Sequence, residues 1–542
     1  MNTNLWVFKI TIMKKKILLF LLLITQTTII AQSFELLDLN VSGDFQPKNF
    51  TEYNGLLIFQ ARGSNGDVEL WKSDGTLSGT ELIKDLDENL SSAPRNFIEF
   101  NGFLYFIAGS SASPSLWRTD GTEVGTTLVT NQAIPQGPFA ILNNLLFFVG
   151  EENNTGKELW ATDGTDAGTY LVKDINPSSW SSLNFNSQLI TYNNYVIFSA
   201  NDGTNGKELW KSDGTEAGTT MIKNITNNSE SSNPLYFIEY KSKIYFAATK
   251  LSSGNELWKT DGTESGTELV EDNRAGDLSS NPSKFFTYSE SLFFQAESDD
   301  DKGIEMHRYN LATNAVQRVA DIYDGNGNGG FSPAIIYNEG MYFTASKPAT
   351  GIELYVRRNG SNIFSEDTFV GTGSGSPTAF CNCGDKMYYR AYDGTENALF
   401  EFDISGNATK IKPSSATNQP FFVSTITELF CFNNELFFAA NYTNSGFDLW
   451  KYSNTTLSIN NEEFLENTIS MYPNPVNSIL NITSKTSLID KIEVFNSIGK
   501  KIIKIKRDSF HHKLNTSHLS TGFYSLKIYS KGKTILKKLI VN

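Results

Sequence analysis

The sequence Glu-Leu-Trp-Lys-Ser-Asp-Gly-Thr at residues 208–215, followed by Glu-Ala-Gly-Thr at 216–219, has eight similar stretches elsewhere in the chain. With the Trp, or the large residue read in its place, as the marker, nine copies lie 43 to 50 residues apart. A repeat of this length indicates successive units of supersecondary structure that pack against their neighbours. The marker positions are 71, 117, 160, 210, 258, 306, 355, 400 and 450.

Residues 96–129 show the secondary structure expected of one unit. Two apolar strands flank Asn101-Gly102, the dipeptide preferred in type I′ hairpin turns, and two further strands flank the Asp-Gly-Thr turn at 120–122. Four antiparallel strands in about 45 residues are typical of a β-propeller blade, and a ring of blades protects strand edges. We therefore predict an all-β fold: a large propeller of about nine four-stranded blades, with eight to ten possible, over residues 32–452.

Ring closure provides a specific expectation for residues 34–40, Phe-Glu-Leu-Leu-Asp-Leu-Asn. They match the fourth-strand segment at 81–86 and precede the first complete hairpin. We expect them to form the outer strand of the last blade, whose other strands come from residues 425–452. Residues 456–460 compete for the same place.

Residues 1–31 have the pattern of an export signal. Lys14-Lys15-Lys16 precedes an apolar core at 17–30, and we expect cleavage near Ala31. No later segment approaches the ~20 apolar residues that a membrane-spanning helix needs. We predict an exported protein with no transmembrane segment in the mature chain.

The distribution of charge separates a C-terminal part from the repeats. Residues 468–542 hold 13 Lys or Arg against 3 Asp or Glu, whereas the remainder holds 32 against 56. The acidic body argues against nucleic-acid binding, which rests on cationic contacts to phosphate. The polar residues 453–467 are predicted to be a linker. About seven short alternating strands follow, which predicts a small β-sandwich at 468–542.

The C-terminal module resembles the type A sorting domain of the type IX secretion system in Bacteroidetes. Four motifs appear in order: Tyr-Pro-Asn-Pro, Phe-Asn with Gly-Lys, Gly-Phe-Tyr, and a Lys-rich apolar ending. The resemblance implies that the secretion machinery carries the protein across the outer membrane. Removal of the module would then release the protein or attach it to surface lipopolysaccharide. The sorting-signal residues are Tyr472, Pro473, Asn474, Pro475, Gly499, Lys500 and Gly522.

The repeats resemble the ELWxxDGT repeat proteins of the same bacteria, a family with no common activity to carry over. Units six to eight depart from its pattern: we read Met306, Tyr355 and Phe400 in place of Trp, and the Asp-Gly-Thr turn is lost. The fold resemblance covers residues 34–452. It leaves the ligand open.

We assign the recurring residues structural roles. Trp lies two residues after Glu, so both point to one face of a strand; we expect the ring to pack against the next blade and the carboxylate to accept hydrogen bonds. Asp is expected to accept N–H groups within its turn. The residues concerned are Trp71, Trp117, Trp160, Trp210, Trp258 and Trp450, with Asp74, Asp120, Asp163, Asp213 and Asp261.

Three cysteines allow at most one internal disulfide. Cys381 and Cys431 lie near corresponding places in successive repeats, so a bridge between neighbouring units is one possibility. The alternative is that these and Cys383 are small buried thiols. The sequence leaves the disulfide state open.

Metal and catalytic signals are weak. Asp324, Asn326 and Asn328 resemble the opening of a calcium loop, but Ile335 occupies the twelfth position, where Glu is needed. We predict no metal or other cofactor, with calcium as the alternative. The sequence shows no zinc spacing, nucleophile elbow or phosphate loop, which favours a protein that is not an enzyme.

A binding role is the leading hypothesis. Loops between blades and between second and third strands share one face of a propeller, and binding residues concentrate on such loops. Trp180 lies among serines in one of these loops and Arg274 in another. We predict a secreted or surface-displayed, non-catalytic protein that binds glycan or protein. The alternatives are a polysaccharide hydrolase or lyase with acidic residues at the channel and a purely structural or adhesion protein.

Overall fold

The computed structural model describes residues 29–37, 44–110, 112–177, 179–185, 187–300, 302–330, 332, 334–358, 364–366, 373–412, 428–441, 446–457, 469–484, 488–496, 500–530 and 533–542. Every regular element in these ranges is a β-strand. One compact unit spans Phe34–Ser453, and Asn454–Asn542 belong to a second. Residues 17–28 of the predicted signal core and most of the predicted linker lie outside the described residues, whereas Ile29 and Ile30 of that core begin the first strand.

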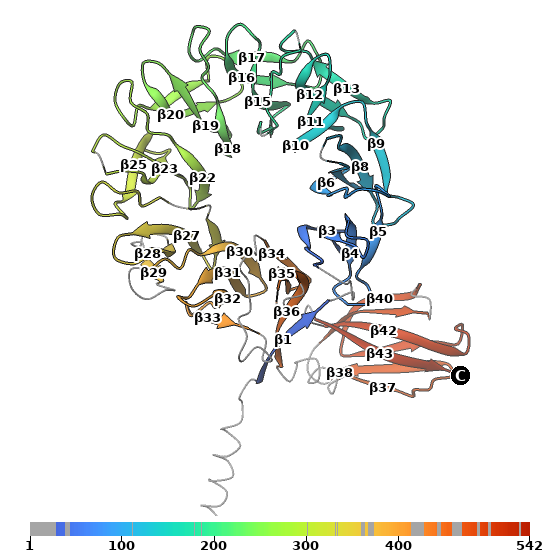
Figure 1. Cartoon of the computed structure of the whole chain (residues 1–542). Coiled ribbons are helices and arrows are strands. Elements are labelled where there is room, and N and C mark those ends of the chain that lie inside the picture. Colours follow the sequence, from blue (N-terminus) through green and yellow to red (C-terminus); the bar gives the residue numbers. More distant parts are fainter. Residues whose placement is uncertain are drawn as a thin grey trace, which may run out of the picture. The chain divides into compact units, whose positions relative to one another are not determined.

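The first unit is a β-propeller. Its described strands form nine four-stranded antiparallel sheets, which surround a common centre (Figure 1). In each of the first eight sheets the strands are neighbours in sequence order, and the earliest lies nearest the centre. These sheets are the predicted blades, and we number them one to nine along the chain.

Blade one consists of β2 (Lys48–Tyr53), β3 (Leu56–Arg62), β4 (Val68–Ser73) and β5 (Glu81–Lys84). Blade two consists of β6 (Arg95–Phe100), β7 (Phe103–Ala108), β8 (Ser115–Thr119) and β9 (Thr127–Thr130). Blade three consists of β10 (Ile134–Leu142), β11 (Leu145–Glu152), β12 (Gly156–Thr162) and β13 (Thr169–Lys173). Blade four consists of β14 (Ile190–Tyr192), β15 (Tyr195–Asn201), β16 (Lys207–Ser212) and β17 (Thr220–Lys223). Blade five consists of β18 (Leu235–Tyr240), β19 (Lys243–Lys250), β20 (Gly254–Thr260) and β21 (Glu268–Glu271). Blade six consists of β22 (Ser283–Tyr288), β23 (Ser291–Ala296), β24 (Glu305–Asn310) and β25 (Ala315–Ala320). Blade seven consists of β26 (Ile335–Tyr337), β27 (Gly340–Lys347), β28 (Gly351–Arg358) and β29 (Phe364–Glu366). Blade eight consists of β30 (Thr378–Cys383), β31 (Lys386–Tyr392), β32 (Asn397–Phe402) and β33 (Ala408–Ile411). Blade nine consists of β34 (Leu429–Phe432), β35 (Glu435–Ala440), β36 (Asp448–Leu457) and β1 (Ile29–Leu36).

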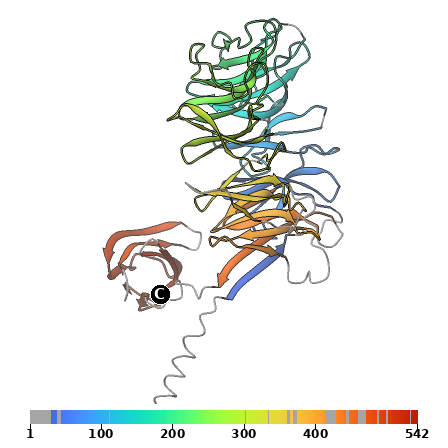
Figure 2. The same ribbon diagram turned by 90° about the vertical axis from the view of Figure 1, so that its left-hand side faces the viewer.

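The ninth blade combines the two ends of the repeat region, as predicted. Strand β1 pairs with β36, and the blue and orange strands lie side by side in Figures 1 and 2. The strand spans Ile29–Leu36 rather than residues 34–40, and the start of the competing segment, Thr456 and Leu457, extends β36 instead. Cleavage near Ala31 would leave the Phe34 ring, 4.7 Å from that of Tyr452, in place.

The repeat tryptophans pack between blades. Trp210 of blade four lies in one apolar cluster with Phe147 and Val149 of blade three, and Trp71 of blade one lies with Phe437 of blade nine. Each indole therefore faces the preceding blade in chain order, whereas the sequence analysis expected the next one. Burying a side chain of this size contributes roughly 2–3 kcal/mol.

Blade six corrects the sequence reading of its aromatic position. In other blades the Trp pairs across the sheet with a Phe of the second strand, as Phe246 does with Trp258. In blade six the corresponding partner of Phe294 is His307, so Met306 occupies the place of the preceding Leu. The spacing from Glu305 gives the same answer, because the aromatic stands two residues after Glu. The buried His307 ring stacks on Phe294 with 6.0 Å between centroids.

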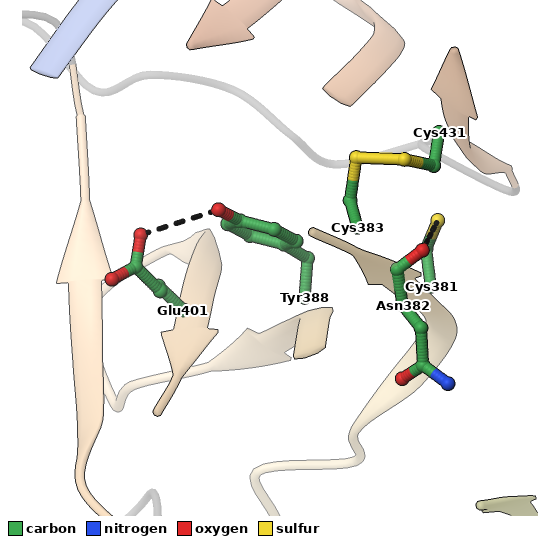
Figure 3. The surroundings of a disulfide bond; sticks show 6 residues. All are labelled: Cys381, Asn382, Cys383, Tyr388, Glu401 and Cys431. Carbon is green, nitrogen blue, oxygen red and sulfur yellow. Dashed lines mark hydrogen bonds between the residues drawn. A yellow bond between two sulfur atoms is a disulfide. The ribbon is translucent and has the colours of Figure 1, made fainter. Parts of the chain in front are cut away.

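A disulfide joins Cys383 and Cys431, so the pairing considered for Cys381 was wrong (Figure 3). Cys383 is the last residue of β30, where the innermost strands of neighbouring blades approach each other. In several other blades this position is a Tyr whose hydroxyl donates to a hairpin carbonyl of the next blade, as Tyr192 does to Ser242 at 2.6 Å. At the eighth junction a covalent bond replaces that hydrogen bond. The thiol of Cys381 is free and partly buried.

Residues from 469 onward form a seven-stranded sandwich with a buried aliphatic core, as predicted. Asn474 ties its opening to the last strand: the carboxamide donates to the Lys538 carbonyl and accepts from the Ile540 N–H, both at 2.8 Å. One sheet contains β37 (Ile469–Tyr472), β38 (Ile479–Ser484) and β41 (His511–Asn515). The other contains β40 (Lys501–Ser509), β39 (Ile489–Phe495), β42 (Gly522–Ser530) and β43 (Lys533–Val541).

The disulfide generates a stability prediction. It closes a loop with a sequence separation of 48 residues, for which the chain-entropy model gives about 4 kcal/mol. We expect Cys383→Ser or Cys431→Ser to lower the thermal unfolding midpoint by several degrees, measured by circular dichroism on oxidised protein. The matched control is Cys381→Ser, which should lower the midpoint far less because Cys381 forms no disulfide and the substitution exchanges one small side chain for another. Equal losses in all three variants would contradict the assigned pairing.

Candidate functional site

The alternating strand directions give the propeller two faces. The hairpins between first and second strands and the turns between third and fourth strands lie on one face, which we call the turn face. The connections between second and third strands and between blades lie on the other, which we call the loop face. Trp180 and Arg274 both belong to inter-blade connections and hence to the loop face.

The aspartates of the repeat are held within their own turns. The Asp213 carboxylate accepts hydrogen bonds from the Thr215 N–H at 2.9 Å and from its hydroxyl at 2.7 Å. Gly214 adopts φ +94°, which a side chain would strain. These hydrogen bonds lower the pKa of Asp213. Four further turns repeat the geometry at Asp74, Asp120, Asp163 and Asp261.

Lysines that follow the tryptophans connect neighbouring blades on the turn face, a role that sequence reasoning missed. The Lys211 ammonium donates to the Gly262 carbonyl of blade five at 2.9 Å. Lys451 of blade nine makes the same contact with Gly75 of blade one at 2.9 Å. The sequence signal for this contact between blades was the Lys that recurs directly after Glu-Leu-Trp. The Gly of each turn thus receives a donor from the preceding blade.

The repeat glutamates hold the loops that lead into the next blade. One oxygen of the Glu158 carboxylate accepts from the Ser182 N–H at 3.1 Å, and the other accepts from the Ile175 N–H at 3.2 Å and from the Ser182 hydroxyl. Glu208 makes the same contacts with Ile225 and Ser232. The carboxylates are buried on third strands, far from one another. They are therefore occupied in the scaffold and do not converge on a substrate.

The partners of these glutamates are serine pairs that the sequence analysis passed over. The second Ser binds the carboxylate, and the first, such as Ser181, accepts from the N–H that precedes the Glu, at Lys157. The Ser182 carbonyl accepts from the Asn201 N–H of the next blade at 3.0 Å. The detectable signal was a Ser-Ser dipeptide ending 23 or 24 residues after four of the glutamates, at 91–92, 181–182, 231–232 and 279–280.

Burial changes the protonation of the glutamates. Loss of water raises the pKa of Glu158 and of Glu256 to about 7, despite the hydrogen bonds that favour the ionised form. The pKa values of Glu69, Glu208 and Glu305 are also raised, with burial as the largest cause. The folded propeller therefore holds protons that an unfolded chain releases.

The two binding candidates lie at different blade junctions. The Trp180 side chain is 74% exposed between blades three and four. Nearby, the Lys157 ammonium lies 4.2 Å from the centre of the Phe185 ring. Arg274, between blades five and six, forms an ion pair with Glu297. The structure thus places both residues on the loop face without bringing them together.

The calcium candidates show mixed roles. The Asn328 side-chain oxygen accepts the Ile304 N–H at 2.9 Å, which is the role of the first Ser in other junctions. Asp324 and Asn326 are exposed. In the described ranges, no group of three or more His, Cys, Asp or Glu side chains is arranged to hold a metal ion. The absence of a metal stays a prediction, with calcium at this loop as its alternative.

Three cavities accompany the departure from the repeat. The turn between the third and fourth strands of blade six shortens to residues 311–314, so the long turn that fills other junctions is missing. A cavity of about 510 Å³ opens beside this turn, lined by Lys241, Glu290 and Leu311, and one of about 380 Å³ lies along the hairpins of blades five and six. A third, of about 260 Å³, lies between blades six and seven.

Residues 470–542 match the family model described as the secretion system C-terminal sorting domain. Among the sorting-signal residues, Tyr472 is 54% exposed and Pro473 and Pro475 are also exposed. The Lys500 N–H donates to the Asn496 side chain at 2.9 Å, and Gly522 begins β42. Gly499 lies outside the described residues.

Comparison with solved structures gives distant likenesses. A prolyl endopeptidase studied for inter-domain dynamics is 11% identical with a TM-score of 0.37, over 67% of this chain and 56% of that one. A puromycin-hydrolysing peptidase of Mycobacterium tuberculosis is 8% identical with a TM-score of 0.35, over 67% and 61%. The chain thus spans less than two thirds of either peptidase. Streptogramin B lyase is 12% identical with a TM-score of 0.30, over 78% and 98%. No curated protein matches the chain.

The C-terminal module defines the route of the protein. As a type IX sorting domain, it directs the chain through the type IX secretion machinery to the cell surface or the medium. Within the described residues, no helix is long and apolar enough to cross a membrane.

The raised glutamate pKa values generate a pH prediction. Between the ordinary carboxyl pKa of 4.5 and about 7, the folded chain binds more protons than the unfolded chain, so stability falls as pH rises through this window. We expect the unfolding midpoint to drop by several degrees from pH 5.5 to 8, measured by circular dichroism. The double variant Glu158→Gln, Glu256→Gln should flatten this slope.

Glu216→Gln is the matched control, since Glu216 is exposed in a turn. It should retain the pH slope of the unmodified protein. A midpoint that stays constant from pH 5.5 to 8 would show that the buried carboxyl groups do not take up protons on folding.

Proposed function

We propose that this protein is a non-catalytic binding propeller that recognises an extracellular glycan through its loop face. The sorting domain delivers it to the cell surface or the medium, where polysaccharides are accessible ligands. We also propose that the propeller is a member of the ELWxxDGT repeat proteins and that the chain comes from Bacteroidetes. Both proposals rest on resemblance of sequence.

The exposed indole of Trp180 carries the proposal. At 74% exposure it contrasts with the tryptophans of the repeat, of which Trp160 and Trp210 are 4% and 6% exposed. An indole face that is exposed to solvent is accessible to the ring of a ligand, and burying it there would be favourable. Ser179 and Ser181 flank it in the sequence. A flat aromatic face suits stacking on the apolar face of a sugar ring.

The acidic residues of the repeat support a non-catalytic role. Glu158 and Glu208 are committed to backbone and serine donors, and Asp213 is committed to its own turn. Glycoside hydrolysis needs two carboxyl groups roughly 5–10 Å apart across one bond. The recurring carboxylates are distributed one to a blade instead.

Glycan-array binding of the purified chain tests the proposal. We expect a defined set of glycans to bind and Trp180→Ala to weaken binding at least tenfold, because stacking on an aromatic ring is lost. The matched control is Leu251→Ala, an apolar side chain 64% exposed on the same face, between the second and third strands of blade five. It should bind as the unmodified chain does.

Two outcomes would reject the proposal. Cleavage of a bound polysaccharide would instead support the hydrolase or lyase alternative. Absence of binding across the array would favour recognition of protein or a structural role.

A further inference from the structure

Blade seven departs from the repeat at its aromatic position. Tyr355 stands where most blades carry Trp, and it pairs with Phe343 as the tryptophans pair with their Phe partners. A phenol ring fills less space than an indole. Tyr355 lines the cavity of about 260 Å³ between blades six and seven, together with Ile322 and Val319 of blade six. The smaller ring thus leaves room at a junction that Trp fills elsewhere.

The same cavity is lined by two cations, Lys347 and Arg357. Neither has a carboxylate partner among the described residues. The Arg357 guanidinium instead lies 5.8 Å from the centre of the Phe293 ring. The acid in the lining, Asp321, lies 3.5 Å from the Lys302 ammonium through Oδ2, and its Oδ1 is buried without a hydrogen-bond partner. The lining therefore carries two cations against one carboxylate, an excess of one positive charge.

This excess is unusual in its surroundings. The chain outside the sorting domain carries 56 acidic against 32 basic residues, so a cavity lined by two cations and one acid departs from the acidic composition of the body. Arginines are nevertheless concentrated in blades six to eight, which contain half of the ten in the chain. Arg binds carboxylate and phosphate groups through two parallel hydrogen bonds, which Lys cannot do. These five are Arg308, Arg318, Arg357, Arg358 and Arg390.

We propose that the cavity between blades six and seven binds the oxyanion group of a small ligand, a carboxylated or phosphorylated sugar unit. Arg357 and Lys347 hold the anion, and the Tyr355 and Ile322 side chains form the wall. The volume of about 260 Å³ lies just below the range of drug-sized pockets, so it suits one sugar unit. The site is separate from Trp180, three blade junctions away, and does not depend on it.

Isothermal titration of the full chain tests the site. The probes are D-glucuronate, D-glucose 6-phosphate and D-glucose, which share a pyranose ring and differ in charge. We expect at least one of the two anions to bind and glucose to bind at least tenfold more weakly. The better anion identifies whether carboxylate or phosphate is preferred. Equal affinity for glucose, or binding of none of the three, would overturn the proposal.

Variants locate the bound anion. Arg357→Gln and Lys347→Gln should each weaken anion binding about tenfold, which is a loss of about 1.4 kcal/mol. Lys250 occupies in blade five the register position of Lys347, each paired with the Gly that opens the third strand. Lys250→Gln is therefore the matched control and should bind normally. A loss as large as that of Lys347→Gln would place the anion elsewhere.

The variant Tyr355→Trp restores the residue that most blades carry at this position. Its thermal unfolding midpoint shows whether the variant folds. We expect it to fill the cavity and abolish anion binding while the thermal unfolding midpoint is kept or raised. Unchanged binding in this variant would overturn the site. Trp180→Ala should leave anion binding intact, so failure of the loop-face proposal and failure of this one are distinguishable.

Discussion

Closure of the ring is the constraint on which the propeller depends. A blade buries its apolar faces only against two neighbours, so the ninth junction has to reproduce the other eight. It does so with different residues: Asp44 accepts the Phe447 N–H in place of the usual serine, and the Phe45 carbonyl accepts from Arg62 at 2.7 Å. Within blade nine, Lys451 forms ion pairs with Glu35 at 2.8 Å and Glu435 at 3.4 Å. The backbone geometry is kept while the side chains change.

The buried glutamates show how a polar group can serve a repeat. Glu158 loses its hydration, yet it organises two N–H groups and a hydroxyl that would otherwise be buried without a partner. Each such carboxylate fixes the path by which one blade connects to the next. A row of acidic residues that resembles a catalytic ring in the sequence is thus explained by loop geometry. Function is then to be sought where the repeat changes.

The sequence predicted the ring, its nine sheets and the strand exchange because each follows from a period and from hairpin signals. It misplaced details that depend on register. Met306 was read as the aromatic position because it is large and apolar, whereas the sheet places His307 there. Cys381 was considered for the disulfide because spacing along the chain does not show which residue ends a strand. The cavity beside Tyr355 depends on packing between two blades, which no linear pattern reports.

The pairing of β1 with the last blade also determines when during folding the ring can close. Asp44 and Phe447, which meet at the closing junction, are separated by 403 residues. A contact between such distant residues cannot form until most of the polypeptide has been synthesised or threaded through a pore, and the entropy of bringing the ends together opposes it. Until then the first segment has an unpaired edge, open to other chains.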